Sequence, residues 1–221
     1  MTAVAIIPAR GGSKRLLRKN VLPFKGKPMI AWTIEAALAS GRFFRIIVST
    51  DDEEIAAIAH KYWIMVDRRP DYLATDEARV VDVCADLLNK LGLGNFDRFA
   101  CLYATAPMRT ATDIQIVMDM LETAQFALAA TDYALSPHQA LKINSLNEGE
   151  PMWPDLIEKR HDEMPRFVVD NGSTYGAWIK PFLQQKTFYG NRLKIHVMPR
   201  ERSVDIDTKA DLDYALWLAG R

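Results

Sequence analysis

The amino-terminal segment gathers the residues best suited to bind an anion. Residues 1–30 contain no acidic side chain and seven cations, namely Arg10, Lys14, Arg15, Arg18, Lys19, Lys25 and Lys27. Gly11 and Gly12 stand among them. Glycines let backbone amides approach an anion, and Lys and Arg add charge. The segment therefore predicts a loop that binds a triphosphate. The alternative is a solvated basic loop, which the mutual repulsion of unpaired cations disfavours.

The glycine spacing of this loop differs from two common nucleotide-binding motifs. It matches neither G-x-G-x-x-G nor G-x-x-x-x-G-K-[ST], which disfavours an NAD-dependent oxidoreductase and a P-loop protein. The chain also lacks a G-x-S-x-G or catalytic-cysteine signature. Its two cysteines, Cys84 and Cys101, fall in apolar runs, which predicts buried thiols.

A second candidate for chemistry is an acidic pair near the carboxyl end. Asp205 and Asp207 flank one apolar residue, and in an extended segment such side chains face the same way. Both carboxylates could then meet one divalent cation, and oxygen ligands without His or Cys favour magnesium. Alternatively, Asp207 and Thr208 cap the last helix, with Asp211 in its first turn.

Two further segments are weaker candidates. Leu102–Arg109 follows a predicted central strand, and substrates of parallel sheets lie at the carboxyl ends of their strands. A plain strand-to-helix turn explains this segment equally well. The acids of Asp51–Glu54 could form a metal cluster, but the first turn of a helix, where the helix dipole favours negative charge, is the better interpretation.

The elements that must position these residues follow from hydrophobic periodicity. Short apolar runs predict buried strands at Ala3–Pro8, Arg45–Ser49, Phe99–Ala104, Phe126–Thr131, Tyr175–Ile179 and Lys194–Met198. Helical patterns alternate with them at Pro28–Ser40, at Thr50 to Tyr62 with a capping box over Thr50–Glu53, at Val80–Leu91, from Thr112 onward and at Thr208–Ala219. This alternation predicts an α/β fold, with a Rossmann-like, mostly parallel sheet flanked by helices.

Length and charge place limits on the whole chain. Its 221 residues, with 28 Lys+Arg against 28 Asp+Glu, predict a single domain and no general affinity for nucleic acid or anionic membranes. The prolines and scattered aromatics of residues 136–172 predict a small inserted segment, either a dimerisation arm or a lid. The first residues resemble neither a signal peptide nor a membrane span, so the expected compartment is the cytoplasm.

Together these residues resemble the N-acylneuraminate cytidylyltransferases, or CMP-sialic acid synthetases, over nearly the whole chain. The landmarks are Ile7–Lys14, Arg18–Asn20, Gly26–Ala37, Val48–Ala56, Arg69–Pro70 with Leu73, Ala74 and Asp76, Asn171–Gly172 with Tyr175, and Asp205–Thr208. The resemblance implies a cytidylyltransferase that joins CTP to an eight- or nine-carbon 2-keto sugar acid, giving a CMP-sugar and pyrophosphate. It also implies a single nucleotidyltransferase domain over residues 1–221.

The resemblance assigns roles to individual residues. Arg10, Lys14, Lys19 and Asn20 match the nucleotide-binding loop of the family, and Arg69 matches a nucleotide-side arginine. Asp205 and Asp207 match its magnesium-binding aspartates. Tyr175 matches a sugar-contacting tyrosine, with Phe188 and Tyr189 near a pair of aromatic contacts.

These roles predict a mechanism and an assembly. An anomeric hydroxyl would attack the α-phosphorus in line, Lys19 would stabilise the growing charge, and Asp207 or its metal would take the proton. Lys142, Arg160 and Arg166 are candidates for binding the sugar carboxylate. In the family the inserted segment crosses a dimer interface and reaches the neighbouring site, which implies a homodimer.

One departure from the family bears on the sugar. The sialic-acid enzymes commonly have a sugar-contacting glutamine where this chain has Tyr103, so the resemblance implies that Tyr103 contacts the sugar. A phenol offers one hydroxyl where an amide offers two donors and an acceptor. The Tyr103–Pro107 segment looks more like the pseudaminate branch, so pseudaminate is favoured slightly over N-acetylneuraminate. Alternatives are a CMP-Kdo-type or other sugar nucleotidyltransferase, and a non-catalytic nucleotide-binding protein on the same fold.

Overall fold

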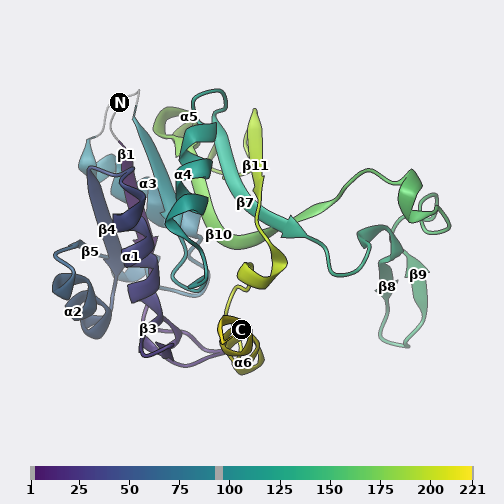
Figure 1. The fold of residues 1–221 in the computed structure, drawn as a ribbon, viewed down its shortest axis with the longest axis horizontal. Helices are drawn as coiled ribbons and strands as arrows, with labels where there is room; N and C mark the ends of the chain where they lie inside the picture. Colours follow the sequence, from purple (N-terminus) through teal and green to yellow (C-terminus); the bar gives the residue numbers. More distant parts are fainter. Residues whose placement is uncertain (1–2, 93–96, 221) are drawn as a thin grey trace.

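A seven-stranded sheet runs through the centre of the computed structural model, which describes residues 3–92 and 97–220 (Figure 1). Its strand order is β11-β7-β10-β6-β1-β4-β5. The strands are β1 (Ala3–Pro8), β4 (Arg45–Thr50), β5 (Met65–Arg68), β6 (Arg98–Leu102), β7 (Phe126–Asp132), β10 (Val168–Trp178) and β11 (Leu193–Val197). Neighbours pair in parallel except at β10, which runs antiparallel to both β6 and β7. The mostly parallel sheet is thus confirmed, with one reversed strand that periodicity did not reveal.

Helices cover both faces of the sheet. They are α1 (Met29–Ser40), α2 (Glu53–Lys61), α3 (Val80–Leu91), α4 (Ala111–Met120), α5 (Ile179–Gln185) and α6 (Lys209–Ala219). The residues of β1 alternate between two cores: Ala5 and Ile7 pack with α1, α2 and α4, whereas Val4 and Ile6 pack with α3 and α5. Burial on both faces explains why the strand is apolar throughout. No helix within the described ranges is long and apolar enough to span a membrane.

The start of α2 differs from the prediction. The capping box over Thr50–Glu53 is wrong, because Asp52 is the N-cap and its carboxylate accepts from the backbone N–H groups of Glu54 and Ile55, each at 3.0 Å. A carboxylate directly before the first turn also suits the positive end of the helix dipole.

Two other helix starts are capping boxes. Helix α4 begins after Thr110 rather than at the predicted Thr112, because the Thr110 hydroxyl and the Asp113 carboxylate cap each other's backbone N–H. Helix α6 has the same arrangement between Thr208 and Asp211. The capping interpretation of Thr208 is therefore confirmed, and Asp207 next to it keeps its carboxylate for other contacts.

The long connection from β1 to α1 folds against the carboxyl-terminal helix. It contains a 3-10 turn at Lys19–Val21 and a short hairpin of β2 (Pro23–Phe24) and β3 (Lys27–Pro28). Phe24 and Met29 pack with Ile206 and with α6 in a third, smaller core. This core brings the basic loop beside the Asp205–Asp207 segment, although about 190 residues separate them in sequence.

The inserted segment projects away from the sheet (Figure 1). It carries a two-stranded hairpin of β8 (Leu141–Ile143) and β9 (Gly149–Pro151), with 3-10 turns at Pro137–Gln139 and His161–Glu163. The sheet resumes at Val168, earlier than the expected Tyr175. Residues 168–172 therefore belong to β10, and the departure from the sheet lies between β7 and β10.

Candidate active site

A cavity of about 140 Å³ lies at the carboxyl ends of β1 and β6. Four of the predicted nucleotide-binding residues line it, together with one predicted sugar contact: Arg10, Lys19, Asn20, Arg69 and Tyr103. The rest of its wall comes from the strand-end segment, from α3 and the loop before it, and from the end of β1: Ala104, Thr105, Val80, Val83, Ala78 and Pro8. The cavity lies at the sheet edge where ligands of open α/β folds bind.

The basic loop is held in shape by its own backbone and by α2. The buried Asn20 donates from Nδ2 to the Arg10 carbonyl at 2.9 Å. The Gly11 N–H donates to Asp51 Oδ1 at 2.9 Å, and a Cβ at Gly11 would lie 2.6 Å from the Asp52 carboxylate. Glycine is required here because a side chain would displace that carboxylate. Arg18 reaches both Asp52 and Glu54, so the Asp51–Glu54 acids act as a helix first turn that anchors the loop.

The cations of the loop do not stand unpaired. Arg10 lies 2.6 Å from Asp76, which Lys14 also contacts. Asp207 receives both Arg15, at 2.5 Å, and Lys19, at 2.6 Å. Their expected mutual repulsion is thus offset by carboxylates from distant parts of the chain.

Asp205 sits deeper than its neighbour Asp207. Its segment is tied to the end of β6 by the Ile206 N–H, which donates to the Thr105 carbonyl at 2.9 Å. The Oδ1 atom of Asp205 is buried and has no hydrogen-bond partner among the described residues. Burial, only partly offset by a hydrogen bond with Thr105, raises the pKa of Asp205 to about 6, and the charge of Asp207 adds to this rise.

The donor set at this place suits a magnesium ion shared with a ligand. Within residues 3–92 and 97–220, no three His, Cys, Asp or Glu side chains gather to enclose a metal. Mg²⁺ is usually held by one or two carboxylates together with substrate phosphates and water. The unpartnered Oδ1 of Asp205, next to the carboxylate of Asp207, provides such a pair of oxygen ligands.

Two buried arginines organise the floor of the site. Arg69 donates to the Ser49 carbonyl at 2.7 Å, which fixes its guanidinium at the cavity wall. Arg109 donates to the Ser173 carbonyl at 2.6 Å and to Thr33 Oγ1 at 2.7 Å. Burial lowers the pKa of Arg109 to about 10. Arg109 thereby joins the strand-end segment to β10, a positioning role that the sequence pattern alone did not reveal.

The predicted sugar contacts divide into exposed and buried residues. Tyr103 packs on Tyr175, with ring centroids 5.2 Å apart, and Tyr175 packs on Phe188 at 4.8 Å. Phe188 and Tyr175 are each only 5% exposed, whereas Tyr189 is 62% exposed. Phe188 therefore supports the aromatic wall from the core. Asp170 joins this wall because it accepts hydrogen bonds from the hydroxyls of Tyr175 and Tyr189. The sequence signal available for Asp170 was its position directly before Asn171–Gly172.

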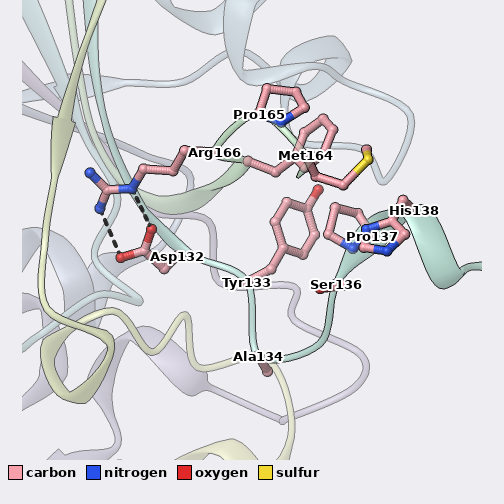
Figure 2. A pocket seen from close by; sticks show the side chains of 10 residues that line it. Asp132, Tyr133, Ala134, Ser136, Pro137, His138, Met164, Pro165 and Arg166 are labelled. Atoms are coloured by element: carbon pink, nitrogen blue, oxygen red, sulfur yellow. Dashed lines mark hydrogen bonds and ion pairs between the residues drawn. The ribbon is translucent and has the colours of Figure 1, made fainter. Parts of the chain in front are cut away.

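The three cations considered for the sugar carboxylate all lie in the inserted segment or at its base. Lys142 contacts Glu150, and Arg160 contacts Asp162. Arg166 points toward Asp132 and donates to both carboxylate oxygens at 2.9 Å (Figure 2). Arg166 lines a separate cavity of about 500 Å³ at the base of the arm, with Tyr133 and His138. None of the three cations lines the cavity between β1 and β6 of its own chain.

Comparison with known sequences shows which family the chain belongs to. A family model described as cytidylyltransferase matches residues 4–218. The pseudaminic acid cytidylyltransferase of Campylobacter jejuni (strain 81-176) is 34% identical over 97% of this chain and 95% of its own length. The CMP-N,N'-diacetyllegionaminic acid synthase of Legionella pneumophila is 35% identical over 96% of this chain and 93% of its own length. The N-acylneuraminate cytidylyltransferase of Escherichia coli O18:K1:H7 is 33% identical, and the match covers 51% of that longer protein.

Solved structures share the fold. A CMP:2-keto-3-deoxy-manno-octonic acid synthetase complexed with CTP superposes with a TM-score of 0.74 at 19% identity, over 100% of this chain and 99% of the other. A 4-diphosphocytidyl-2C-methyl-D-erythritol synthase from Anaerococcus prevotii superposes with a TM-score of 0.69. The Rossmann-like architecture is thus shared with these two solved structures. With the family model spanning nearly the whole sequence, the chain belongs to the cytidylyltransferase family.

Proposed function

We propose that this protein transfers the cytidylyl group of CTP to a nonulosonic, sialic-acid-like sugar acid, giving the CMP-sugar and pyrophosphate. The observation that carries the proposal is the pairing of Asp207 with Arg15 and Lys19 of the basic loop, beside the cavity that Lys19 lines. A triphosphate and its metal need this combination of cations and oxygen ligands. The full-length similarity to pseudaminic acid and diacetyllegionaminic acid enzymes supports the sugar class.

In the proposed reaction the anomeric hydroxyl of the sugar acid attacks the α-phosphorus of CTP. A bond forms between that oxygen and the phosphorus, the bond to the β-phosphate oxygen breaks, and pyrophosphate leaves with the electron pair. Arg10, Lys14 and Lys19 neutralise the charge that grows on the leaving group. Asp207, beside Lys19, accepts the proton of the hydroxyl.

The same proposal gives magnesium a place. Asp205 and Asp207 would hold the ion, and when bound it would supply positive charge that neutralises the triphosphate. Lys19 and Arg15 orient Asp207 by pairing with it. The nucleotide lies along Arg10, Asn20 and Arg69 on the cavity wall.

Pseudaminate is the sugar acid we favour slightly over N-acetylneuraminate. Tyr103, at the junction of the nucleotide cavity and the aromatic wall, presents a flat apolar face to the sugar. Two Campylobacter jejuni relatives at 33–34% identity carry the name pseudaminic acid cytidylyltransferase. A CMP-Kdo-type activity is the second candidate, and the likeness to that synthetase rests on the fold alone.

We further propose a cytoplasmic homodimer. A lone two-stranded hairpin is marginally stable in water, yet the β8–β9 arm extends from the sheet with Leu141 and Ile143 exposed. A second copy would cover these side chains and bring Lys142, Arg160 or Arg166 toward the sugar carboxylate of its neighbour. The free, buried thiols of Cys84 and Cys101 suit a reducing compartment.

A substrate panel tests the proposal. Pyrophosphate release is measured with CTP, UTP, GTP and ATP, each against pseudaminate, N-acetylneuraminate, N,N'-diacetyllegionaminate and Kdo. The expected result is strict preference for CTP and turnover of nonulosonic acids, with pseudaminate fastest. Preference for another nucleotide would refute the cytidylyl assignment, and turnover of N-acetylneuraminate alone would refute the pseudaminate preference. Turnover of Kdo alone would favour the second candidate.

A further inference from the structure

A carboxylate that sequence reasoning did not single out organises the aromatic wall. Asp170, on β10, accepts hydrogen bonds from three donors. Its Oδ1 receives the Gly172 N–H at 2.9 Å, and the Tyr175 hydroxyl donates to Oδ1 at 2.9 Å and Oδ2 at 2.8 Å. The Tyr189 hydroxyl donates to Oδ2. The pairing of β10 with β7 shifts register between Asp170 and Tyr175, and this irregularity lets one strand place both residues on the same hydrogen-bonded cluster.

The two phenols play different parts because their exposure differs. Tyr175 is 5% exposed and packs between Tyr103 and Phe188, so it holds Asp170 from the core side. Tyr189 is 62% exposed, and its hydroxyl reaches the same carboxylate from the solvent side. The accessible part of this cluster is therefore the Tyr189 ring with its phenol oxygen, fixed in place by Asp170.

The hydrogen-bond direction is settled by the chemistry of the groups. An ionised carboxylate has no proton to donate, and a phenol has only one. Burial first, and the hydrogen bond to Asp170 second, raise the pKa of Tyr189 to about 12, so this phenol keeps its proton at neutral pH. Since that proton is directed to Asp170, the free lone pairs of the phenol oxygen can only accept. The wall thus offers acceptors to a ligand and no hydroxyl donor from either tyrosine.

The charge of the wall points the same way. The Asp205 carboxylate lies close by, because a Cβ at Gly172, whose N–H donates to Asp170, would lie 2.6 Å from Asp205 Oδ2. Asp207 is already paired with two cations of the basic loop, but Asp170 has no cation among its described contacts and would repel the carboxylate of a sugar acid. Neutral donors such as hydroxyl and amide N–H groups would be attracted to Asp170.

From these contacts we infer that Asp170 is a specificity-determining positioning residue, which fixes Tyr189 as an acceptor so that the wall selects hydroxyl and amide N–H donors of the sugar acid and turns its carboxylate away. This inference rests on the proposed function and deepens it. It gives the bound sugar an orientation, with its donor-bearing carbons toward Asp170 and its carboxylate on the opposite side.

The test uses Asp170→Asn, which keeps the size of the side chain but replaces one acceptor oxygen by a donor. At least one phenol can then no longer donate to that position, and its proton turns toward the ligand. Tyr189→Phe removes the exposed oxygen alone. The matched control is Glu35→Gln, because Glu35 also accepts from a phenol, that of Tyr62 at 2.9 Å, and neither of these two lines the cavity.

Sugar-acid binding to the full chain is measured by calorimetry, with CTP turnover measured in parallel. Asp170→Asn and Tyr189→Phe should each weaken sugar-acid binding and raise its KM by roughly tenfold, about the effect of one hydrogen bond, while the KM for CTP and the values for Glu35→Gln stay within about twofold. The double variant should be no weaker than the worse single variant, because both act on one interaction. Difference absorbance of the free protein should show loss of a tyrosine–carboxylate hydrogen bond in both single variants.

Substrate derivatives give the sharper readout. O-Methylation of the hydroxyl that faces the wall removes a donor and keeps the oxygen, so it should weaken binding to wild type but cause little further loss in Asp170→Asn. The inference would be overturned if methylation at every position lowered the affinity of wild type and of Asp170→Asn equally. Unchanged sugar-acid affinity in Asp170→Asn would overturn it as well. Binding that depends on Asp170 without CTP turnover would refute the proposed function and keep the inference. A wild-type protein that binds no sugar acid overturns both.

Discussion

The Nζ atom of Lys19 lies 2.6 Å from Oδ1 of Asp207, although 188 positions separate the two residues in sequence. One belongs to the basic loop after β1, and the other begins the turn into α6. Their pairing joins the cationic and the acidic halves of the proposed site before any ligand arrives. A metal-bound triphosphate would replace this pair with two others, phosphate on Lys19 and metal on Asp207.

Loss of the buried carboxylate should remove metal-dependent turnover without unfolding the protein. Asp205→Asn is expected to lower kcat by roughly 10²-fold or more, since it removes a charged metal ligand from the transition state. Turnover is measured across a magnesium titration, with EDTA-treated wild type as reference. Asp213→Asn, which alters an exposed carboxylate of α6 paired with Lys209, should behave as wild type. Full activity in Asp205→Asn would contradict a metal role, provided that circular dichroism shows the native fold.

Removal of the loop cation should act on the nucleotide. Lys19→Met keeps the length of the aliphatic chain but leaves Asp207 with Arg15 as its only cation among the described contacts. We expect kcat/KM for CTP to fall by about 10²-fold, with the sugar-acid KM little changed. Steady-state kinetics with each substrate varied in turn measures this. The exposed Lys209→Met is the matched control, and an equal loss there would show a nonspecific effect of charge.

The stability of the fold should depend on pH through Asp113. Burial alone would raise the pKa of this carboxyl, but hydrogen bonds from Arg202, His196 and Thr110 outweigh burial and hold its pKa well below the usual range. The folded state therefore binds fewer protons than the unfolded state, in which an Asp titrates near 3.9. This stabilisation is complete above the unfolded pKa and is lost as pH falls toward the folded pKa.

Urea unfolding at a series of pH values checks this. Asp113→Asn should lower the free energy of unfolding by about 3 kcal/mol at neutral pH, because it breaks a buried ion pair. The difference in unfolding free energy between this variant and wild type should become smaller below about pH 4. Asp119→Asn, at an exposed pair with Arg42, should show a small difference at every pH. A difference for Asp113→Asn that does not change with pH would contradict the linkage.

The β8–β9 hairpin of the inserted segment should control formation of the proposed dimer. Ile143 is 70% exposed on the β8–β9 hairpin, so Ile143→Glu should not disturb an isolated chain but should break an interface that covers it. Sedimentation velocity is expected to show a dimer for wild type and a monomer for Ile143→Glu, with turnover of the sugar acid reduced and CTP binding kept. Leu38→Glu, at an exposed site on α1, should leave the dimer intact. A wild-type monomer would refute the assembly.

Elements with strong local signals were predictable from the sequence. The apolar run of β1 matches its predicted bounds, and α1 begins within one residue of its prediction. The helix starts at Asp52 and Thr110 were misplaced because several capping residues stand close together, and only the folded backbone decides which of them meets a free N–H. The direction of β10 depends on the path of the arm, which leaves no periodic signal.

The parts of the site that lie within one short segment could be predicted from the sequence. The contacts between distant segments could not. The basic loop and the Asp205–Asp207 pair each stand out as short segments. Asp170 does not, because an isolated acid is informative only once its partners are known. Asp76 is a landmark of the resemblance, but its pairing with Arg10 and Lys14 is visible only in the fold. Phe188 shows the converse: its type suits a ligand contact, but its burial between Tyr175 and Phe182 is visible only in the fold.

The ion pairs of the basic loop also affect which polyanions can bind to it. A protein binds a nucleic acid strongly when a row of uncompensated cations displaces the condensed counterions of the backbone. Here Arg10, Lys14, Arg15, Arg18 and Lys19 each contact a carboxylate. A strand of RNA would have to break these contacts. It would carry no chelated metal ion to pair with the carboxylates that it frees. In the proposed reaction a magnesium–triphosphate would supply both charges at once, so the same ion pairs would favour a small chelated nucleotide over the bulk polyanions of a cell.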